Sequence, residues 1–148
     1  MSDAVILDSG PLGVLCNPYH SQKPFAIRVW VADLLKVGRR GILPDIMDYE
    51  IRRELIRNQS HNALALLDFQ GTRLEYLPLT TAAMRCAADL WAQARNAGQP
   101  TVVDWALDCD VILAAQALTL GAPAVIATTN IAHLSRFTQA ELWQNIVP

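Results

Sequence analysis

The sequence AVILDSGP occupies residues 4–11 and carries the first strong structural signal of the chain. Its apolar start is typical of a short buried strand, and Gly10 and Pro11 then mark a turn. Asp8 stands at the boundary, where its carboxylate can cap the segment that follows. A strand that is apolar at every position indicates a parallel sheet covered on both faces.

Short apolar strands and helical patterns alternate along the rest of the chain. Further strands are predicted at residues 41–43, 74–77, 124–127 and 142–147, and helices at 25–37, from 45 onward, 61–69, 80 to about 98, and 108–120. This alternation predicts an α/β fold built from parallel βαβ units. Since no repeat or linker-like segment interrupts the pattern, residues 1–148 are expected to form a single domain.

Composition excludes several classes of protein. The 148 residues are 52% hydrophobic and 18% charged, which supports a folded core and excludes disorder. No apolar run approaches the roughly 18–20 residues of a membrane span, and no signal-peptide pattern is present. Three widely spaced cysteines without a CxxC motif favour neither disulfides nor a zinc site. We therefore expect a cytoplasmic protein without a membrane anchor.

Three carboxylates stand in apolar surroundings. Asp8 follows the first strand, Glu50 interrupts an apolar helical stripe, and Asp110 opens the segment DVILAA. Asp110 shares a helix face with the residues three, four, seven and eight positions further on, which are Leu113, Ala114, Ala117 and Leu118. Taken singly, each acid could cap a helix or pair with an arginine. Taken together, buried carboxylates need a cation, and oxygen ligands favour Mg²⁺ or Mn²⁺, which can activate water toward a phosphodiester.

Four segments along the chain match one known family. They read VILDS at 5–9, YEIRREL at 49–55, DVILAAQA at 110–117 and TTN at 128–130, and in this order they resemble the PIN domain, most closely that of bacterial VapC-type toxin nucleases. The resemblance spans residues 4 to about 137. It implies a three-layer α/β/α fold with a short central parallel sheet, and an endoribonuclease that hydrolyses RNA phosphodiester bonds with Mg²⁺ or Mn²⁺. It also implies a small antitoxin partner protein and a homodimer.

The resemblance assigns the metal-binding and catalytic roles to Asp8, Glu50 and Asp110. Ser9 matches the hydroxyl residue after the first acid, and Asn130 matches the polar residue after the late strand, each in contact with the acids or the substrate. Glu54 is the alternative to Glu50, one helical turn further along the same face. Glu50 is preferred because it lies nearer the helix start and follows the position that the family motif specifies.

One position departs from the family pattern. His133 stands where the family often has a fourth acid. Its side chain could ligate a transition metal, contact phosphate, or be an ordinary polar loop residue. The departure leaves open whether the site takes one metal ion or two. It also leaves an alternative function, a degenerate PIN module that binds RNA or a partner protein without cleavage.

Half of the 12 basic residues lie in a short part of the chain, at Lys36, Arg39, Arg40, Arg52, Arg53 and Arg57. We expect Arg39 and Arg40 to steer the RNA backbone, the alternative being a solvated face. Two other enzyme classes are excluded. A haloacid-dehalogenase-type phosphatase needs an acid where Gly10 stands, and a dinucleotide-binding domain needs a GxGxxG loop that is missing after the first strand.

Overall fold

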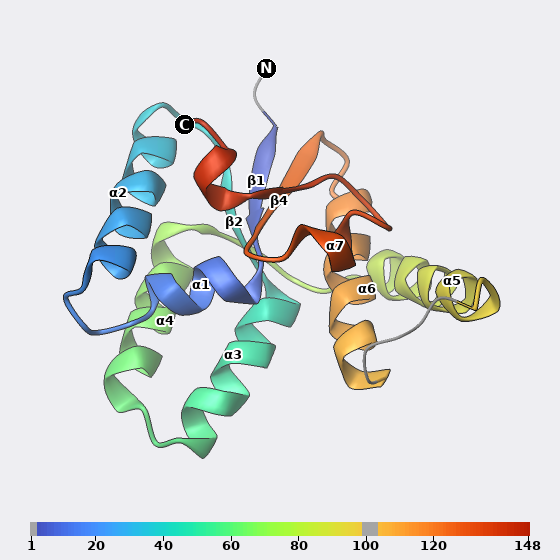
Figure 1. Ribbon diagram of the computed structural model, residues 1–148, viewed down its shortest axis with the longest axis horizontal. Coiled ribbons are helices and arrows are strands. Elements are labelled where there is room, and N and C mark those ends of the chain that lie inside the picture. Colours follow the sequence, from blue (N-terminus) through green and yellow to red (C-terminus); the bar gives the residue numbers. More distant parts are fainter. Residues whose placement is uncertain (1–2, 99–103) are drawn as a thin grey trace.

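Across the residues that the computed structural model describes, 3–98 and 104–148, five parallel strands form one sheet in the order β3-β2-β1-β4-β5 (Figure 1). They are β1 (Ala4–Leu7), β2 (Gly41–Pro44), β3 (Glu75–Leu77), β4 (Ala124–Thr128) and β5 (Ala140–Leu142). Strand β1 pairs with β2 and with β4, and the register places Leu7 beside Ala127. The carboxyl ends of the two central strands therefore lie side by side.

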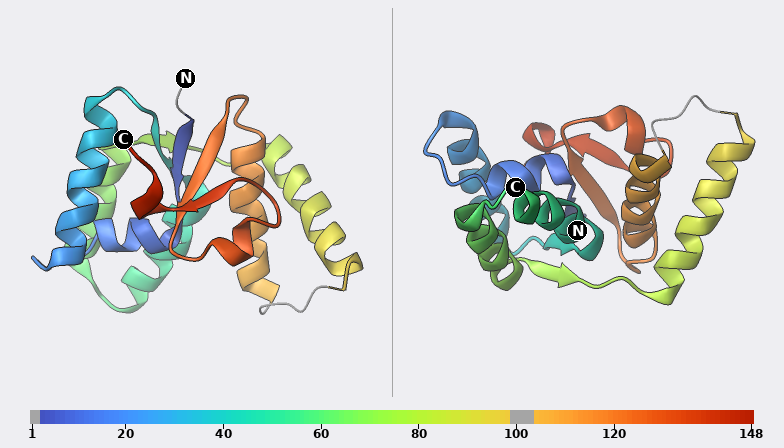
Figure 2. Two further views of the ribbon diagram at one scale, coloured as in Figure 1. Left: turned by 45° about the horizontal axis from the view of Figure 1, so that its top comes forward. Right: turned by 90° about the horizontal axis from the view of Figure 1, so that it is seen from below.

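Helices connect consecutive strands and flank the sheet. They are α1 (Ser9–Leu15), α2 (Gln22–Lys36), α3 (Asp45–Arg57), α4 (His61–Arg73), α5 (Thr81–Asn96), α6 (Asp104–Leu118) and α7 (Ile131–Leu134), and a 3-10 turn η1 follows at Trp143–Asn145. Helices α2 and α4 lie on one side of the strands, and α5 and α6 lie on the other (Figures 1 and 2). The predicted α/β/α architecture around a short parallel sheet is therefore confirmed.

Burial on both faces of the sheet explains why the central strands could be predicted from the sequence. Every residue of β1 and β2 is buried, as expected for strands covered on both faces. The edge strands β3 and β5 are partly exposed. Among the helices in the described ranges, none combines the length and apolar character that crossing a bilayer requires.

The predicted placement of the last strand and the predicted start of the helix at 108–120 were wrong. Strand β5 covers Ala140–Leu142 rather than residues 142–147, because the chain turns after Leu142 and buries Trp143 against Trp30, with ring centroids 5.5 Å apart. Trp30 also donates its indole N–H to the Ile146 carbonyl at 2.8 Å, which fixes the C-terminal segment on α2. Helix α6 begins at Asp104 rather than at 108, so Asp110 lies in its second turn.

Gln59 ends α3 in an unusual backbone conformation. Its φ of 55° lies in the left-handed region, and the Ser60 N–H closes the turn onto the Leu55 carbonyl at 2.9 Å. Glycine adopts this conformation without the cost that a β-carbon brings. Gln59→Gly should therefore raise the free energy of unfolding by about 0.5–1 kcal/mol in urea titrations. Gln93→Gly, within exposed α5, is the matched control and should lower it by a similar amount; equal losses for both variants would contradict the prediction.

Candidate active site

Asp8 lies at the carboxyl end of β1 and caps α1. One carboxylate oxygen accepts a 2.7 Å hydrogen bond from the Ser9 N–H, and the other accepts a 2.7 Å bond from the Thr128 hydroxyl. Burial raises the pKa of Asp8, and the hydrogen bonds from Thr128 and Ser9 oppose that rise. Because Thr128 ends the neighbouring strand β4, the pairing of β1 with β4 positions this carboxylate.

Glu50 lies on α3 and Asp110 on α6, two helices that contact each other, and both acids are near enough to Asp8 for its charge to act on them. Burial raises the pKa of Glu50 most, and the charge of Asp8 raises it further. Burial raises the pKa of Asp110 to about 6, with further upward contributions from Asp8 and Glu50. The three predicted acids are thus close enough to repel one another, and the fold brings them together at the ends of the central strands.

Ser9 and Cys109 hold the carboxylate of Glu50. Hydrogen bonding from Cys109 and Ser9 lowers the pKa of Glu50 against the effect of burial, and the single hydroxyl proton of Ser9 can serve either Glu50 or Asp8 at one time. The predicted contact of Ser9 with the acids is therefore present. Glu54, the alternative acid on α3, is instead bound to Arg57 at 2.6 Å with half of its side chain exposed. Of the two glutamates, Glu50 is the one that joins the site.

Asn130 joins the network through its backbone. Its N–H donates to the Thr128 hydroxyl oxygen at 3.0 Å, while its side chain makes no capping bond at the start of α7. Thr128 itself is the residue that sequence reasoning missed, although it stands in the segment TTN that had been singled out. The signal that identifies it is its place at the end of the strand beside β1.

A histidine and two arginines lie near the acids. His133 Nδ1 lies 3.7 Å from Asp110 Oδ2, and the charges of His133 and Arg136 both lower the pKa of Asp110. Arg136 Nε donates to the His133 carbonyl at 3.1 Å, which links the two residues. On α3, the charge of Arg53 lowers the pKa of Glu50. The site therefore combines three acids with a cationic margin.

Arg39 and Arg40 do not join this site. They precede β2, and the Arg40 carbonyl accepts the Val5 N–H at the start of β1, so both lie at the opposite end of the sheet from Asp8. The Arg40 guanidinium binds both carboxylate oxygens of Glu75, and Arg39 Nε donates to the Asp3 carbonyl at 2.9 Å. Both arginines have structural partners there.

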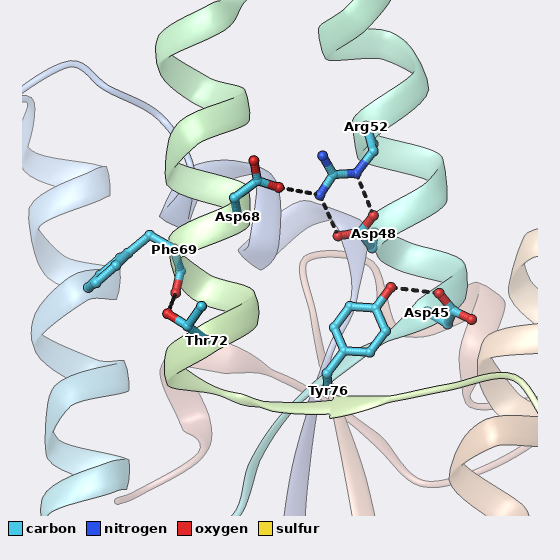
Figure 3. Close-up of polar contacts among 7 residues, drawn as sticks. All are labelled: Asp45, Asp48, Arg52, Asp68, Phe69, Thr72 and Tyr76. Carbon is cyan, nitrogen blue, oxygen red and sulfur yellow. Dashed lines mark hydrogen bonds and ion pairs between the residues drawn. The ribbon is translucent and has the colours of Figure 1, made fainter.

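Arg52, from the same basic stretch, links α3 to α4. It binds both oxygens of Asp48, at 2.8 and 3.0 Å, and Asp68 at 2.7 Å (Figure 3). At the start of α3, Asp45 accepts a 2.6 Å bond from the Tyr76 hydroxyl of β3 (Figure 3). These contacts fix the helix that carries Glu50, so this part of the basic cluster supports the fold.

The chemistry of the acidic set fits a hard divalent cation. Asp8, Glu50 and Asp110 offer only carboxylate oxygens. Burial is the main cause of their raised pKa values, and the negative charge of Asp8 adds to it for Glu50 and Asp110, so a bound cation would stabilise the ionised forms. Within residues 3–98 and 104–148, no three His, Cys, Asp or Glu side chains are grouped in a way that could hold a metal ion in this conformation, so binding a cation would require these acids to move closer together. Mg²⁺ suits such an arrangement because it binds through few carboxylates and retains several waters.

Gln116 fixes α6 relative to α3. Its amide nitrogen donates to the Leu77 carbonyl at 2.9 Å, and its oxygen accepts the Ile46 N–H at 3.4 Å. Gln116→Leu would leave both backbone groups without a partner in the interior. We expect it to lower the free energy of unfolding by about 2 kcal/mol in urea titrations. Gln93→Leu, on exposed α5, should change it by less than about 0.5 kcal/mol, and equal effects would contradict the role of the Gln116 bonds.

Comparison with known proteins was informative for structure alone. No family model and no curated protein matches the sequence. A chain of VapBC2 from Rickettsia felis, solved bound to a DNA fragment from its promoter, matches 95% of this chain and 98% of its own, with 16% identity and a TM-score of 0.73. A chain of VapBC-1 from nontypeable Haemophilus influenzae covers 96% of this chain and is itself covered to 99%, with 16% sequence identity and a TM-score of 0.70. A chain of FitAcB from Neisseria gonorrhoeae also covers 96% of this chain and is covered to 99%, with 17% sequence identity and a TM-score of 0.67. The chain therefore has the PIN-like α/β/α fold seen in these complexes.

Proposed function

We propose that this protein is a metal-dependent endoribonuclease that hydrolyses RNA phosphodiester bonds with Mg²⁺ or Mn²⁺. The observation that carries the proposal is the convergence of Asp8, Glu50 and Asp110, each with a raised pKa, at the carboxyl ends of adjacent parallel strands. Ligand and catalytic sites of open parallel sheets lie at this edge. Buried acids that repel one another destabilise the fold, so their presence favours a function that uses them.

In this proposal each residue of the acidic site has its own role in the hydrolysis. Asp8 and Asp110 would hold the cation, which when bound supplies a Lewis acid for the phosphodiester and lowers the pKa of an attacking water. Glu50, held by Ser9 and Cys109, would bind the same cation or orient the water by accepting its hydrogen bond. Thr128 keeps Asp8 in position through its hydroxyl. Arg136 would place positive charge near Asp110, where a phosphate would approach.

Partners form a second part of the proposal. The solved structures that share this fold include VapBC complexes, which supports a small antitoxin-like protein as the partner of this chain. We also propose that the protein is a homodimer. We propose the cytoplasm as its compartment, in keeping with three cysteines that are all free. Sedimentation of the purified protein would test the dimer, and a neighbouring gene for a small protein would support the partner.

A module that binds RNA without cutting is the second candidate. The contact of His133 with Asp110 favours it, because a protonated imidazole there competes with a cation for the same carboxylate. In that case the acids would serve no catalytic step, and their neutralisation would leave RNA binding intact.

A metal titration separates the two functions. Wild type and the Asp8→Asn/Asp110→Asn double variant are incubated with a labelled mixed RNA pool over a range of Mg²⁺ and Mn²⁺ concentrations, and thermal unfolding is recorded in parallel. The nuclease predicts metal-dependent cutting and a metal-dependent rise in melting temperature for wild type alone. Wild type that neither cuts nor gains stability, with both proteins folded, would leave the binding module as the better account.

A further inference from the structure

Tyr49 presents a large aromatic ring to solvent one residue before Glu50. Its exposed fraction is 56%, although its neighbours Met47 and Asp48 are buried. No packing requirement of α3 explains an aromatic residue at this position, because the ring faces away from the core. The next residue along the helix reaches the acidic site. The ring therefore stands at the margin of the candidate active site.

Arg53 connects this ring to the acids. Its guanidinium lies over the Tyr49 ring, 5.2 Å from the centroid, and the two side chains share a hydrogen bond. Arg53 follows Tyr49 by four residues and Glu50 by three, so it lies between them on the helix surface. Its charge acts on the carboxylate of Glu50. An aromatic face, a planar cation and a catalytic carboxylate thus lie on adjacent positions of one helix.

We propose that Tyr49 and Arg53 form a stacking platform for an unpaired base next to the phosphate that is cleaved. The inference rests on the proposed nuclease function and names what the site recognises. Bases of single-stranded RNA stack on aromatic rings and on guanidinium planes. Bases in a duplex are already stacked within the helix and cannot reach such a platform.

The charges around the site fit a nucleic-acid strand as the occupant. After α7, Arg136 lies over the Phe137 ring at 4.9 Å and its charge acts on Asp110, as the charge of Arg53 acts on Glu50. Two arginine–aromatic pairs, one on α3 and one after α7, therefore lie near enough to the acids for their charges to act on them. A strand that runs between them would meet positive charge at its phosphates and an aromatic face at its base, with the acids between.

Binding measurements without cleavage test the platform. A fluorescent single-stranded oligouridylate of about 12 nucleotides is titrated with protein in Ca²⁺, and anisotropy gives Kd. Tyr49→Ala should weaken binding about tenfold, whereas Tyr49→Phe should stay within about twofold of wild type, since it keeps the ring. Phe69→Ala removes an aromatic of similar exposure on α4 and should have no effect. Because Tyr49 is exposed, its variants are expected to fold, and thermal unfolding checks this.

A strand without bases isolates stacking from charge. Wild type should bind a ribose-phosphate strand of the same length about tenfold more weakly than oligouridylate, and Tyr49→Ala should bind it as wild type does. If Tyr49→Ala weakened binding equally with and without bases, or not at all, the platform would be refuted. A change of oligomeric state in Tyr49→Ala without a change in RNA affinity would also refute it, and would assign the ring to a protein interface.

Cleavage in Mg²⁺ or Mn²⁺ separates this inference from the proposed function. If wild type and Tyr49→Ala cut single-stranded RNA equally well, the platform fails and the nuclease stands. If wild type neither binds nor cuts RNA, both fail. Support requires that wild type cut single strands faster than duplexes of the same sequence, and that Tyr49→Ala lose this preference.

Discussion

Asp8→Asn should lower the rate of metal-dependent RNA cleavage by at least about 100-fold while the protein stays folded. Asparagine has the shape of aspartate and keeps a carbonyl oxygen, so a bond from the Thr128 hydroxyl or the Ser9 N–H can persist. What disappears is the negative charge that would hold the cation. The rate is followed on a labelled RNA under single-turnover conditions, at saturating Mn²⁺.

The control for this prediction is Asp33→Asn, which makes the same change of charge at an exposed position on α2. It should cut at the wild-type rate, since no residue of the acidic site touches it. Circular dichroism of all three proteins excludes unfolding as the cause of a loss. A rate for Asp8→Asn within about threefold of wild type would show that Asp8 does not hold the catalytic cation.

The fold was largely predictable because its central strands are continuous apolar runs. Val5 and Ile42 stand in apolar runs that Asp8 and Pro44 end, and the run of Ile126 begins after Pro123, so each signal is local. The edge strand β5 contains Glu141 and is partly exposed, so no apolar run marks it. The position of β5 is set by its pairing with β4. A local sequence pattern does not indicate which strand another strand will pair with.

The acids of the site were predictable, whereas most of their partners were not. Asp110 was recognisable because Leu113, Ala114 and Ala117 of the same helix face are buried, although Leu118 at the helix end proved half exposed. Thr128 was missed because it meets Asp8 only through the pairing of two strands that are 120 residues apart.

The basic residues Arg39 and Arg40 show a second limit of prediction from sequence. A cluster of basic residues is visible in the chain, but which end of the sheet it occupies depends on strand direction. Arg39 and Arg40 enter β2, whereas the acids follow the strand ends. Arg53 and Arg136, which do border the acids, lie in segments far apart in the chain and gave no combined signal.

Asp110→Asn should stabilise the metal-free protein at neutral and alkaline pH. The folded protein raises the pKa of Asp110 from 3.8 to about 6, so the fold favours the protonated form. The stability that this preference contributes is fully present below about 3.8 and is lost as the pH rises through about 6. Asparagine resembles the protonated acid at every pH. At pH 8 in EDTA, the variant should therefore exceed wild type by about 1–2 kcal/mol in free energy of unfolding, after allowance for solvent screening.

The difference in free energy of unfolding between Asp110→Asn and wild type should depend on both pH and metal. Well below pH 3.8, at about pH 2.5, the two proteins should be equally stable, because the Asp110 carboxyl is then protonated in both folded and unfolded wild type. Saturating Mg²⁺ or Mn²⁺ at pH 8 should stabilise wild type and leave Asp110→Asn nearly unchanged, which reverses the order. Urea titrations at about pH 2.5 and pH 8, with EDTA or metal, give the four free energies of unfolding for each protein, and Asp33→Asn should follow wild type throughout. A wild type more stable than Asp110→Asn at pH 8 in EDTA would mean that the carboxylate has a stabilising partner in the folded protein, and that no cation is needed to offset its charge.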